Sequence, residues 1–276
     1  MQAANFVKIG LRNPMNKKLI LILCEPRTGS NLLCEAMDSY SNLQSINEFY
    51  LSPNIGLYVR KDHVPDDLPH KDRLTQGQQE SLFKFLKIES LNHFDMLVGI
   101  YESPIKSLVE LYNVTEKTLV IKIMRAHFEE LVLDDLLDLP FVEAIVLERS
   151  NKLEEYVSHR KAIELDQWYN TDTSNLKIKV DVDKFLERTQ ISNVWYKKIR
   201  QHLNSSKKHY LELNYEKDLL NFNQDEFCKI FDDWLLKINV DVDKTNHRMK
   251  FFKKQNNAPI SQSISNYDDV VNKLQW

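Results

Sequence analysis

Short apolar runs alternate with helical patterns along most of the chain. Runs rich in Ile, Leu and Val that end at turn residues predict β-strands, and apolar residues spaced three or four positions apart predict helices. Because the two patterns alternate, we expect an α/β fold in which parallel strands are covered by helices on both faces. Strands are expected at 19–24, 95–100, 118–124, 143–149 and 208–214, and helices at 30–41, 75–93, 127–138, 151–167, 183–204 and 223–238.

Two segments between these elements show neither pattern. Segment 51–73 is rich in prolines and charges, and segment 169–181 is short and polar, so both are expected to be loops or lids. Neither resembles a linker between domains. A chain of 276 residues is long enough for one large α/β domain, and we therefore expect a single domain over 1–276.

The first apolar run leads into a turn that is suited to binding an anion. Leu19 to Cys24 predicts a buried strand, the turn contains Arg27 and Gly29, and a helix follows. A strand, a glycine turn and a helix together present free backbone N–H groups and the positive end of the helix dipole to a phosphate. Ser30 or Asn31 is expected to cap the helix. The alternative is an ordinary strand-turn-helix unit with a surface arginine.

The low glycine content excludes two familiar nucleotide-binding motifs. The chain has five glycines, and no two of them lie in one loop. Neither GxGxxG nor GxxxxGK[ST] can therefore be written. Cys24 lies too close to Arg27 for a cysteine-phosphatase signature, and Gly29-Ser30-Asn31 lacks the glycines of a serine-hydrolase turn. What remains is a phosphate loop with arginine in place of the Walker lysine.

The segment 19–33 resembles the 5′-phosphosulfate loop of sulfotransferases that use 3′-phosphoadenosine-5′-phosphosulfate (PAPS). A second element of that family is a strand ending in arginine with a serine two helical turns later, which Arg149 and Ser158 match. The spacing from Arg149 to Ser158, followed by Trp168, is similar to that in one branch of the family. This branch contains trehalose 2-sulfotransferase and bacterial lipopolysaccharide or nodulation-factor sulfotransferases. The resemblance implies a P-loop-like parallel sheet flanked by helices, PAPS as cofactor, and a 3′-phosphate held by Arg149 and Ser158.

The resemblance also assigns the catalytic groups. Glu48 matches the carboxylate that takes the proton from the acceptor hydroxyl, while Arg27 would neutralise charge on the departing phosphate. Burial should raise the pKa of a base at that position. Lys254 or Lys253 matches a basic residue that returns to the cofactor phosphates. A solvated carboxylate and a solvated basic tail are the alternatives for Glu48 and for the lysines.

The loop departs from the family pattern at three positions. Asn31 stands where threonine is usual, so that an amide must replace a hydroxyl contact, and Thr28 replaces the commoner serine. Glu25 adds a negative charge that must be paired or point away from the anion. The expected cofactor-binding residues are Arg27, Thr28, Gly29, Ser30, Asn31, Arg149, Ser158 and Lys254.

Three further residues are candidates for lining the active site or contacting the acceptor. Lys122 lies inside an apolar strand, where lysine is rare in a core, and it resembles a lysine near the active site of the branch. His127 is either an auxiliary base or acceptor contact, or simply a cap or surface group. Trp168 either stacks on adenine or lines the acceptor cleft, unless it is a core residue.

Composition agrees with a cytoplasmic enzyme. A net charge of −3 provides no general basic field for nucleic acid, so anion affinity must come from local clusters. The three cysteines have neither metal nor disulfide spacing, which favours a reducing compartment. The longest apolar run, at 19–24, is too short to span a membrane, and no metal is expected.

These observations lead to one main hypothesis and two alternatives. The main hypothesis is a PAPS-dependent sulfotransferase acting on a hydroxyl of a carbohydrate or glycolipid. The first alternative is a kinase-like phosphotransferase that uses ATP and does not need a 3′-phosphate on its cofactor. The second is a non-catalytic protein that binds 3′-phosphoadenosine nucleotides without catalysing a reaction. Members of the similar branch can form homodimers. The sequence identifies neither the acceptor nor the oligomeric state.

Overall fold

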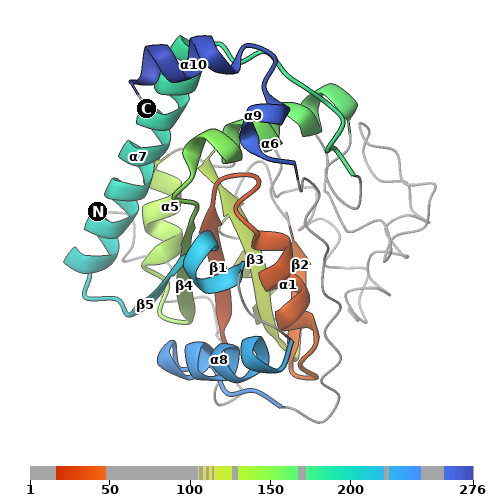
Figure 1. Ribbon diagram of the computed structural model, residues 1–276. Coiled ribbons are helices and arrows are strands. Elements are labelled where there is room, and N and C mark those ends of the chain that lie inside the picture. The colour runs from red at the N-terminus through yellow and green to blue at the C-terminus, as the bar shows by residue number, and fades with distance from the viewer. Residues whose placement is uncertain are drawn as a thin grey trace, which may run out of the picture.

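The centre of the structure is a five-stranded parallel β-sheet with strand order β2-β3-β1-β4-β5 (Figure 1). The computed structural model describes residues 17–47, 105, 108–109, 112–113, 115–125, 130–166, 172–220, 224–243 and 258–275. The strands are β1 (Leu19–Cys24), β2 (Leu43–Asn47), β3 (Thr118–Met124), β4 (Val142–Glu148) and β5 (Tyr210–Asn214). The predicted α/β fold, a parallel sheet flanked by helices, is confirmed.

Strand β1 lies in the middle of the sheet and is completely buried. It pairs with β3 on one side and β4 on the other, so that Leu21 lies opposite Ile121 and Ala144. Since successive side chains point to opposite faces and both faces are covered, every position of β1 can be apolar. This is why the strand is an unbroken apolar run in the sequence.

Two pairs of helices cover the two faces of the sheet (Figure 1). Helices α1 (Ser30–Asp38) and α8 (Gln224–Lys237) pack against the face that carries Ile20 and Ile22. Helices α5 (Glu130–Leu137) and α7 (Val182–Ser205) pack against the opposite face. Their buried apolar residues on that face are Leu133, Leu136, Leu137, Tyr196, Ile199 and Leu203. Each face therefore has its own apolar core.

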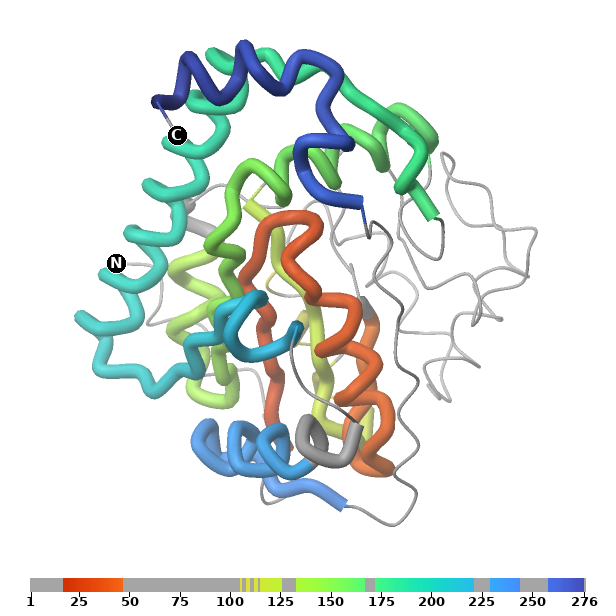
Figure 2. Tube along the Cα trace, viewed as in Figure 1, coloured from red at the N-terminus to blue at the C-terminus, as the bar shows by residue number. Residues whose placement is uncertain are grey.

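A third apolar cluster joins helix α6 (Lys152–Leu165) to the C-terminal helices α9 (Ile260–Ser263) and α10 (Tyr267–Leu274), which lie beside α6 and the start of α7 in Figure 2. Segment 172–181 runs between them, and Ile178 forms a parallel bridge with Ile264. Buried Lys161 donates hydrogen bonds to the Thr173 carbonyl (2.9 Å) and to Ser263 Oγ (3.0 Å). The described part of the predicted 169–181 loop is thus attached to the C-terminal segment.

Four of the described elements were not expected from the sequence: strand β2, the π-helical turn η4 (Tyr215–Leu219), and helices α9 and α10. Strand β2 has a register irregularity between Ser45 and Asn47, which breaks the two-residue alternation that would have revealed it. Helices α9 and α10 lie in a polar segment that was assigned no helix. The predicted strand 95–100, helix 75–93 and loop or lid 51–73 lie outside the described residues.

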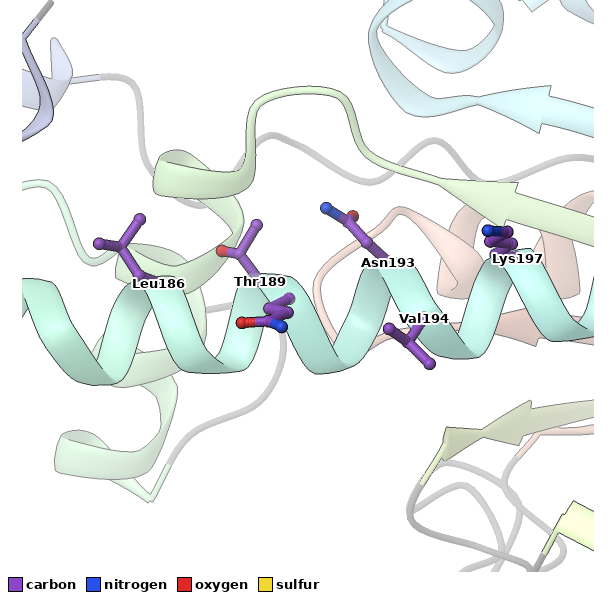
Figure 3. A pocket seen from close by; sticks show the side chains of 6 residues that line it. Leu186, Thr189, Asn193, Val194 and Lys197 are labelled. Carbon is purple, nitrogen blue, oxygen red and sulfur yellow. The ribbon is translucent and has the colours of Figure 1, made fainter.

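The longest described helix, α7, has a shallow hollow of about 430 Å³ on its outer face (Figure 3). All the residues that line it belong to α7: Leu186, Thr189, Gln190, Asn193, Val194 and Lys197. None of them is a predicted site residue, so the hollow is separate from the site considered below. Among the described residues, no helix has the length and apolar character needed to cross a membrane.

The hydroxyl of Tyr196 should stabilise the fold, because it links the ends of two neighbouring strands. It accepts a hydrogen bond from the Glu25 N–H (2.9 Å) and donates one to the Leu147 carbonyl (2.8 Å), and the side chain is fully buried. Tyr196→Phe removes both hydrogen bonds, so we expect the free energy of unfolding to fall by about 1–3 kcal/mol in urea denaturation. Tyr156→Phe is the control, since its hydroxyl makes no hydrogen bond with the described residues. Equal losses in both variants would contradict this role.

Candidate functional site

The candidate site lies where two neighbouring parallel strands end. The loop that contains Arg27 and Gly29 follows β1, and Arg149 directly follows β4. In open α/β sheets, ligands bind outside the carboxyl ends of the strands. The sheet thus brings together two sequence segments that are more than a hundred residues apart.

The loop after β1 has an unusual backbone. Arg27 has φ 72° and Gly29 has φ 86°, so both lie in the left-handed region. A Cβ atom on Gly29 would lie 2.6 Å from Cδ2 and 2.9 Å from Cε2 of Tyr215, which leaves room for glycine alone. A non-glycine residue in this region costs energy and is typical of functional sites. At Arg27 the conformation is supported by Arg149, whose Nη1 donates to the Arg27 carbonyl (3.3 Å).

Helix α1 begins without a side-chain cap. Its N-cap is Gly29, and the first helical hydrogen bond is donated by the Leu32 N–H to the Gly29 carbonyl (2.9 Å). The N–H groups of Ser30 and Asn31 precede that bond and therefore have no acceptor within the helix. The expectation that Ser30 or Asn31 caps α1 is wrong, because the cap position belongs to glycine. This end of α1 has the donors and the dipole of an anion site.

Side chains of the loop divide into those that hold it and those that can reach a ligand. Thr28 is fully buried and its hydroxyl donates to the Glu25 carbonyl (2.7 Å), so its proton is used inside the turn. Asn31 Oδ1 accepts from Nζ of buried Lys122 on β3 (2.6 Å). Since the amide oxygen faces Lys122, the Asn31 NH₂ group faces away from it and can donate elsewhere. Lys122 and Asn31 are thus brought together, a contact that no local sequence pattern indicates.

The Arg149 side chain is buried and has polar contacts on three of its atoms. Nε lies 3.2 Å from Glu216 Oε1, Nη2 lies 2.5 Å from Glu154 Oε2, and Nη1 contacts the Arg27 carbonyl. The guanidinium also lies over the ring of Tyr215, 4.7 Å from its centroid. Arg149 is therefore ion-paired with Glu154 and Glu216 and not with the preceding residue, Glu148. Glu148 is paired instead with Lys152 and Arg200.

Arg27 and Ser158 are in direct contact. Arg27 Nε donates to Ser158 Oγ over 3.0 Å, so the serine two turns into α6 lies at the β1 loop. Burial and the nearby charge of Arg149 lower the pKa of Arg27 from 12.5 to about 10. Two arginines held this close repel each other, and a bound anion would relieve that repulsion. The structure therefore brings Arg27 into contact with both Ser158 and Arg149.

The negative charge of Glu25 is compensated, as its position in the loop required. The residue is buried, and its carboxylate contacts Arg125 Nε (2.8 Å) and Arg188 Nη2 (3.6 Å). Arg188 also lies 3.0 Å from Nδ1 of His159. Burial, followed by the charges of Arg188 and Arg27, lowers the pKa of His159 to about 3. His159 is therefore neutral near pH 7, and its Nδ1 accepts the proton of Arg188.

Tyr215 and Glu216 were missed in the sequence. They form the start of η4 (Tyr215–Leu219), a π-helical turn that directly follows β5. The Tyr215 ring lies against Gly29, and Glu216 accepts from the N–H groups of Ser150 (2.8 Å) and Asn151 (3.3 Å) at the start of α6. Two polar residues directly after a strand, such as Tyr215 and Glu216 after β5, are a sequence signal for a site residue. The strand order that places β5 next to β4 is not visible in the sequence.

Four predicted site residues, Glu48, His127, Trp168 and Lys254, lie outside the described residues. Their roles stay predictions, as does the choice between Lys253 and Lys254. Within the described part of the chain, no group of three or more His, Cys, Asp or Glu side chains could hold a metal ion.

Comparison with known proteins includes a remote structural likeness. No protein-family model matches the chain, and no curated protein matches it. Among solved structures, it is similar to the crystal structure of sulfotransferase STF1 from Mycobacterium tuberculosis H37Rv (type1 form), with 11% identity and a TM-score of 0.41. The match covers 82% of this chain and 68% of that chain. A likeness at this identity and TM-score is too remote to support a conclusion about function.

Gly29 should tolerate no side chain. In Gly29→Ala, the new Cβ meets the Tyr215 ring and the residue keeps a positive φ, so we expect the free energy of unfolding to fall by about 1–3 kcal/mol. Urea denaturation measures the loss. Ser30→Ala is the matched variant, since Ser30 is the next residue and lies within α1. If Gly29→Ala proves as stable as Ser30→Ala, the loop is not constrained in this way.

Glu155, buried on α6, should make stability depend on pH. Its Oε2 has no hydrogen-bond partner among the described residues and lies 3.7 Å from Lys152 Nζ. Burial outweighs this nearby positive charge and raises the pKa of Glu155 from 4.5 to about 7. The folded state therefore holds this proton more tightly than the unfolded state, and the resulting stability is lost as pH rises from about 4.5 through 7. Glu155→Gln cannot ionise, so it should match the wild type near pH 4.5 and exceed it by about 1–3 kcal/mol at pH 8.

Urea denaturation at both pH values tests this expectation. Glu164→Gln is the control, because Glu164 is an exposed glutamate on the same helix. A Glu155→Gln variant that is less stable than the wild type at pH 8 would show that the ionised carboxylate stabilises the fold instead.

Proposed function

We propose that this protein is a PAPS-dependent sulfotransferase that transfers a sulfonate group to a hydroxyl, with a carbohydrate or glycolipid as the acceptor class. The observation that carries the proposal is the meeting of Arg27, Arg149 and the uncapped start of α1 at the ends of two neighbouring strands. The motif resemblance of the loop, Arg149 and Ser158 supplies the identity of the ligand.

The described residues fit PAPS because they offer two anion positions. The first lies at Gly29, where the backbone can approach a ligand closely and where the Ser30 and Asn31 N–H groups are not used by the helix. The second lies at Arg149 and Ser158, at the start and on the second turn of α6. We assign the 5′-phosphosulfate to the first and the 3′-phosphate to the second. Bound PAPS would supply an activated sulfonyl group.

The residues of the loop would then orient and stabilise the reacting atoms. The Asn31 NH₂ group, turned away from Lys122, would donate to a sulfonate or 5′-phosphate oxygen. Arg27 would neutralise the charge that builds on the departing phosphate, where one preorganised donor is worth about 3 kcal/mol. Thr28 would hold the turn through Glu25 rather than contact the ligand with its proton.

The base is proposed from the sequence. Glu48 would take the proton of the acceptor hydroxyl as that oxygen replaces the 5′-phosphate on sulfur, so that the products are a sulfate ester and 3′-phosphoadenosine-5′-phosphate (PAP). Lys254 would close over the phosphates. Lys122, with His127 and Trp168, would line the active site.

The position of the second phosphate tests the proposal. PAP and adenosine 5′-diphosphate (ADP) differ in where that phosphate is attached, so only PAP can place it at Arg149. We expect PAP to bind at least about tenfold more tightly than ADP in calorimetry. Arg149→Ala should weaken PAP binding roughly 10- to 100-fold, the range of a lost charge-assisted contact, while ADP binding changes little.

Two further variants separate this effect from damage to the loop. Arg149 also supports the Arg27 carbonyl, so Arg149→Lys, which keeps the charge but loses the forked geometry, is measured beside the alanine variant. Arg160→Ala removes one positive charge from an exposed position on α6 and should leave PAP binding unchanged. Equal wild-type affinities for PAP and ADP would contradict the proposal and favour a kinase-like phosphotransferase.

A further inference from the structure

The two carboxylates that contact Arg149 are held in very different ways. Glu216 accepts from Arg149 Nε and from the N–H groups of Ser150 and Asn151. The Glu154 carboxylate accepts from Arg149 Nη2, and within the described part of the chain this is its one hydrogen-bond donor. Glu216 is therefore fixed to the start of α6, whereas the Glu154 side chain depends on one charged partner.

Position also favours movement of Glu154. Its side chain is 33% exposed, while that of Arg149 is 7% exposed, so the carboxylate lies on the solvent side of the guanidinium. The backbone of Glu154 is secured separately, because its N–H donates to Oδ1 of the N-cap residue Asn151 (3.0 Å). The carboxylate can thus turn into solvent by side-chain rotation, without any loss of helix.

We propose that Glu154 is an exchangeable counter-ion of Arg149, which occupies the guanidinium when no nucleotide is bound and is displaced by the 3′-phosphate. This inference rests on the proposed function, because it concerns the same phosphate position. Glu154 would then set how tightly the site holds its nucleotide. Glu216 keeps its contacts throughout and positions Arg149.

The chemistry of the two anions supports the exchange. A phosphate monoester carries a charge of about −1.5 to −2 near neutral pH and has three acceptor oxygens, so it competes well with one carboxylate for an arginine fork. Arg149 has five N–H donors, and its contacts with Glu216 and the Arg27 carbonyl leave the Nη2 side for an incoming anion once Glu154 withdraws. Ser158, in contact with Arg27, lies one helical turn beyond Glu154 on α6.

The exchange also accounts for the charge balance of the site without nucleotide. Arg149 is buried beside a second arginine, Arg27, and Glu216 alone would leave these two adjacent cations only partly compensated. Glu154 supplies a second negative charge there. The same contact opposes ligand binding, because it must be broken before a phosphate can take its place.

Calorimetry of PAP and ADP on Glu154→Gln tests the inference. Without the competing charge, PAP should bind about tenfold more tightly than to the wild type, whereas ADP, which places no phosphate at Arg149, should change less than about twofold. Glu164→Gln removes the same charge from an exposed position on the same helix and should leave both affinities unchanged. The ligand-free Glu154→Gln protein should also have a lower Tm.

Glu216→Gln provides the contrast. It weakens the contacts that fix Arg149 and the start of α6, so PAP should bind less tightly and Tm should fall. If Glu154→Gln leaves PAP binding unchanged or weaker, while the wild type still prefers PAP to ADP, the exchange is wrong and the proposed function stands. If Glu216→Gln tightens PAP binding as much as Glu154→Gln does, the assignment of the moving carboxylate is wrong. Equal wild-type affinities for PAP and ADP would remove the proposed function, and this inference with it.

Discussion

The candidate site depends on the contacts made by the side chain of Arg149. It follows β4, donates to the Arg27 carbonyl in the loop after β1, and lies over Tyr215 in the turn after β5. One guanidinium therefore fixes the relative positions of three strand ends. Its delocalised charge and its several donors allow it to contact a carbonyl, a carboxylate and an aromatic ring at once, which a lysine could not do.

The site is built from charges that compensate one another, in which buried Glu25 and Arg149 are paired with partly exposed side chains. Glu25 lies between Arg125 and Arg188, and His159 is kept neutral beside Arg188. Arg27 contacts Ser158, and Arg149 contacts Glu154. Buried ion pairs contribute little net stability, since desolvation offsets their attraction. Their value here is geometric, because each pair sets the position of a loop that has two residues with positive φ.

The sequence revealed the local parts of this arrangement. The apolar run of β1, the turn with Gly29 and the start of helix α1 each depend on neighbouring residues, and all three lie where the sequence predicts them. Strand β2 is hidden in the sequence because its alternation is broken, and the cap of α1 is hidden because Gly29 has no side chain that could mark it as a cap. Local patterns can locate a loop, but they cannot show what packs against it.

The remaining contacts depend on tertiary structure that no local pattern contains. Tyr215 reaches Gly29 only because β5 joins the edge of the sheet beside β4, and Lys122 reaches Asn31 only because β3 neighbours β1. Arg188 meets Glu25 across the packing of α7 on the sheet. These long-range neighbours decide which charges are compensated, and therefore which groups are left for a ligand.

A crystal structure of the protein with PAP tests the central claim most directly. The account predicts the 5′-phosphate at the start of α1, within hydrogen-bond distance of the Ser30 and Asn31 N–H groups, and the 3′-phosphate on Arg149. A nucleotide bound elsewhere, or a 3′-phosphate that makes no contact with Arg149, would contradict it.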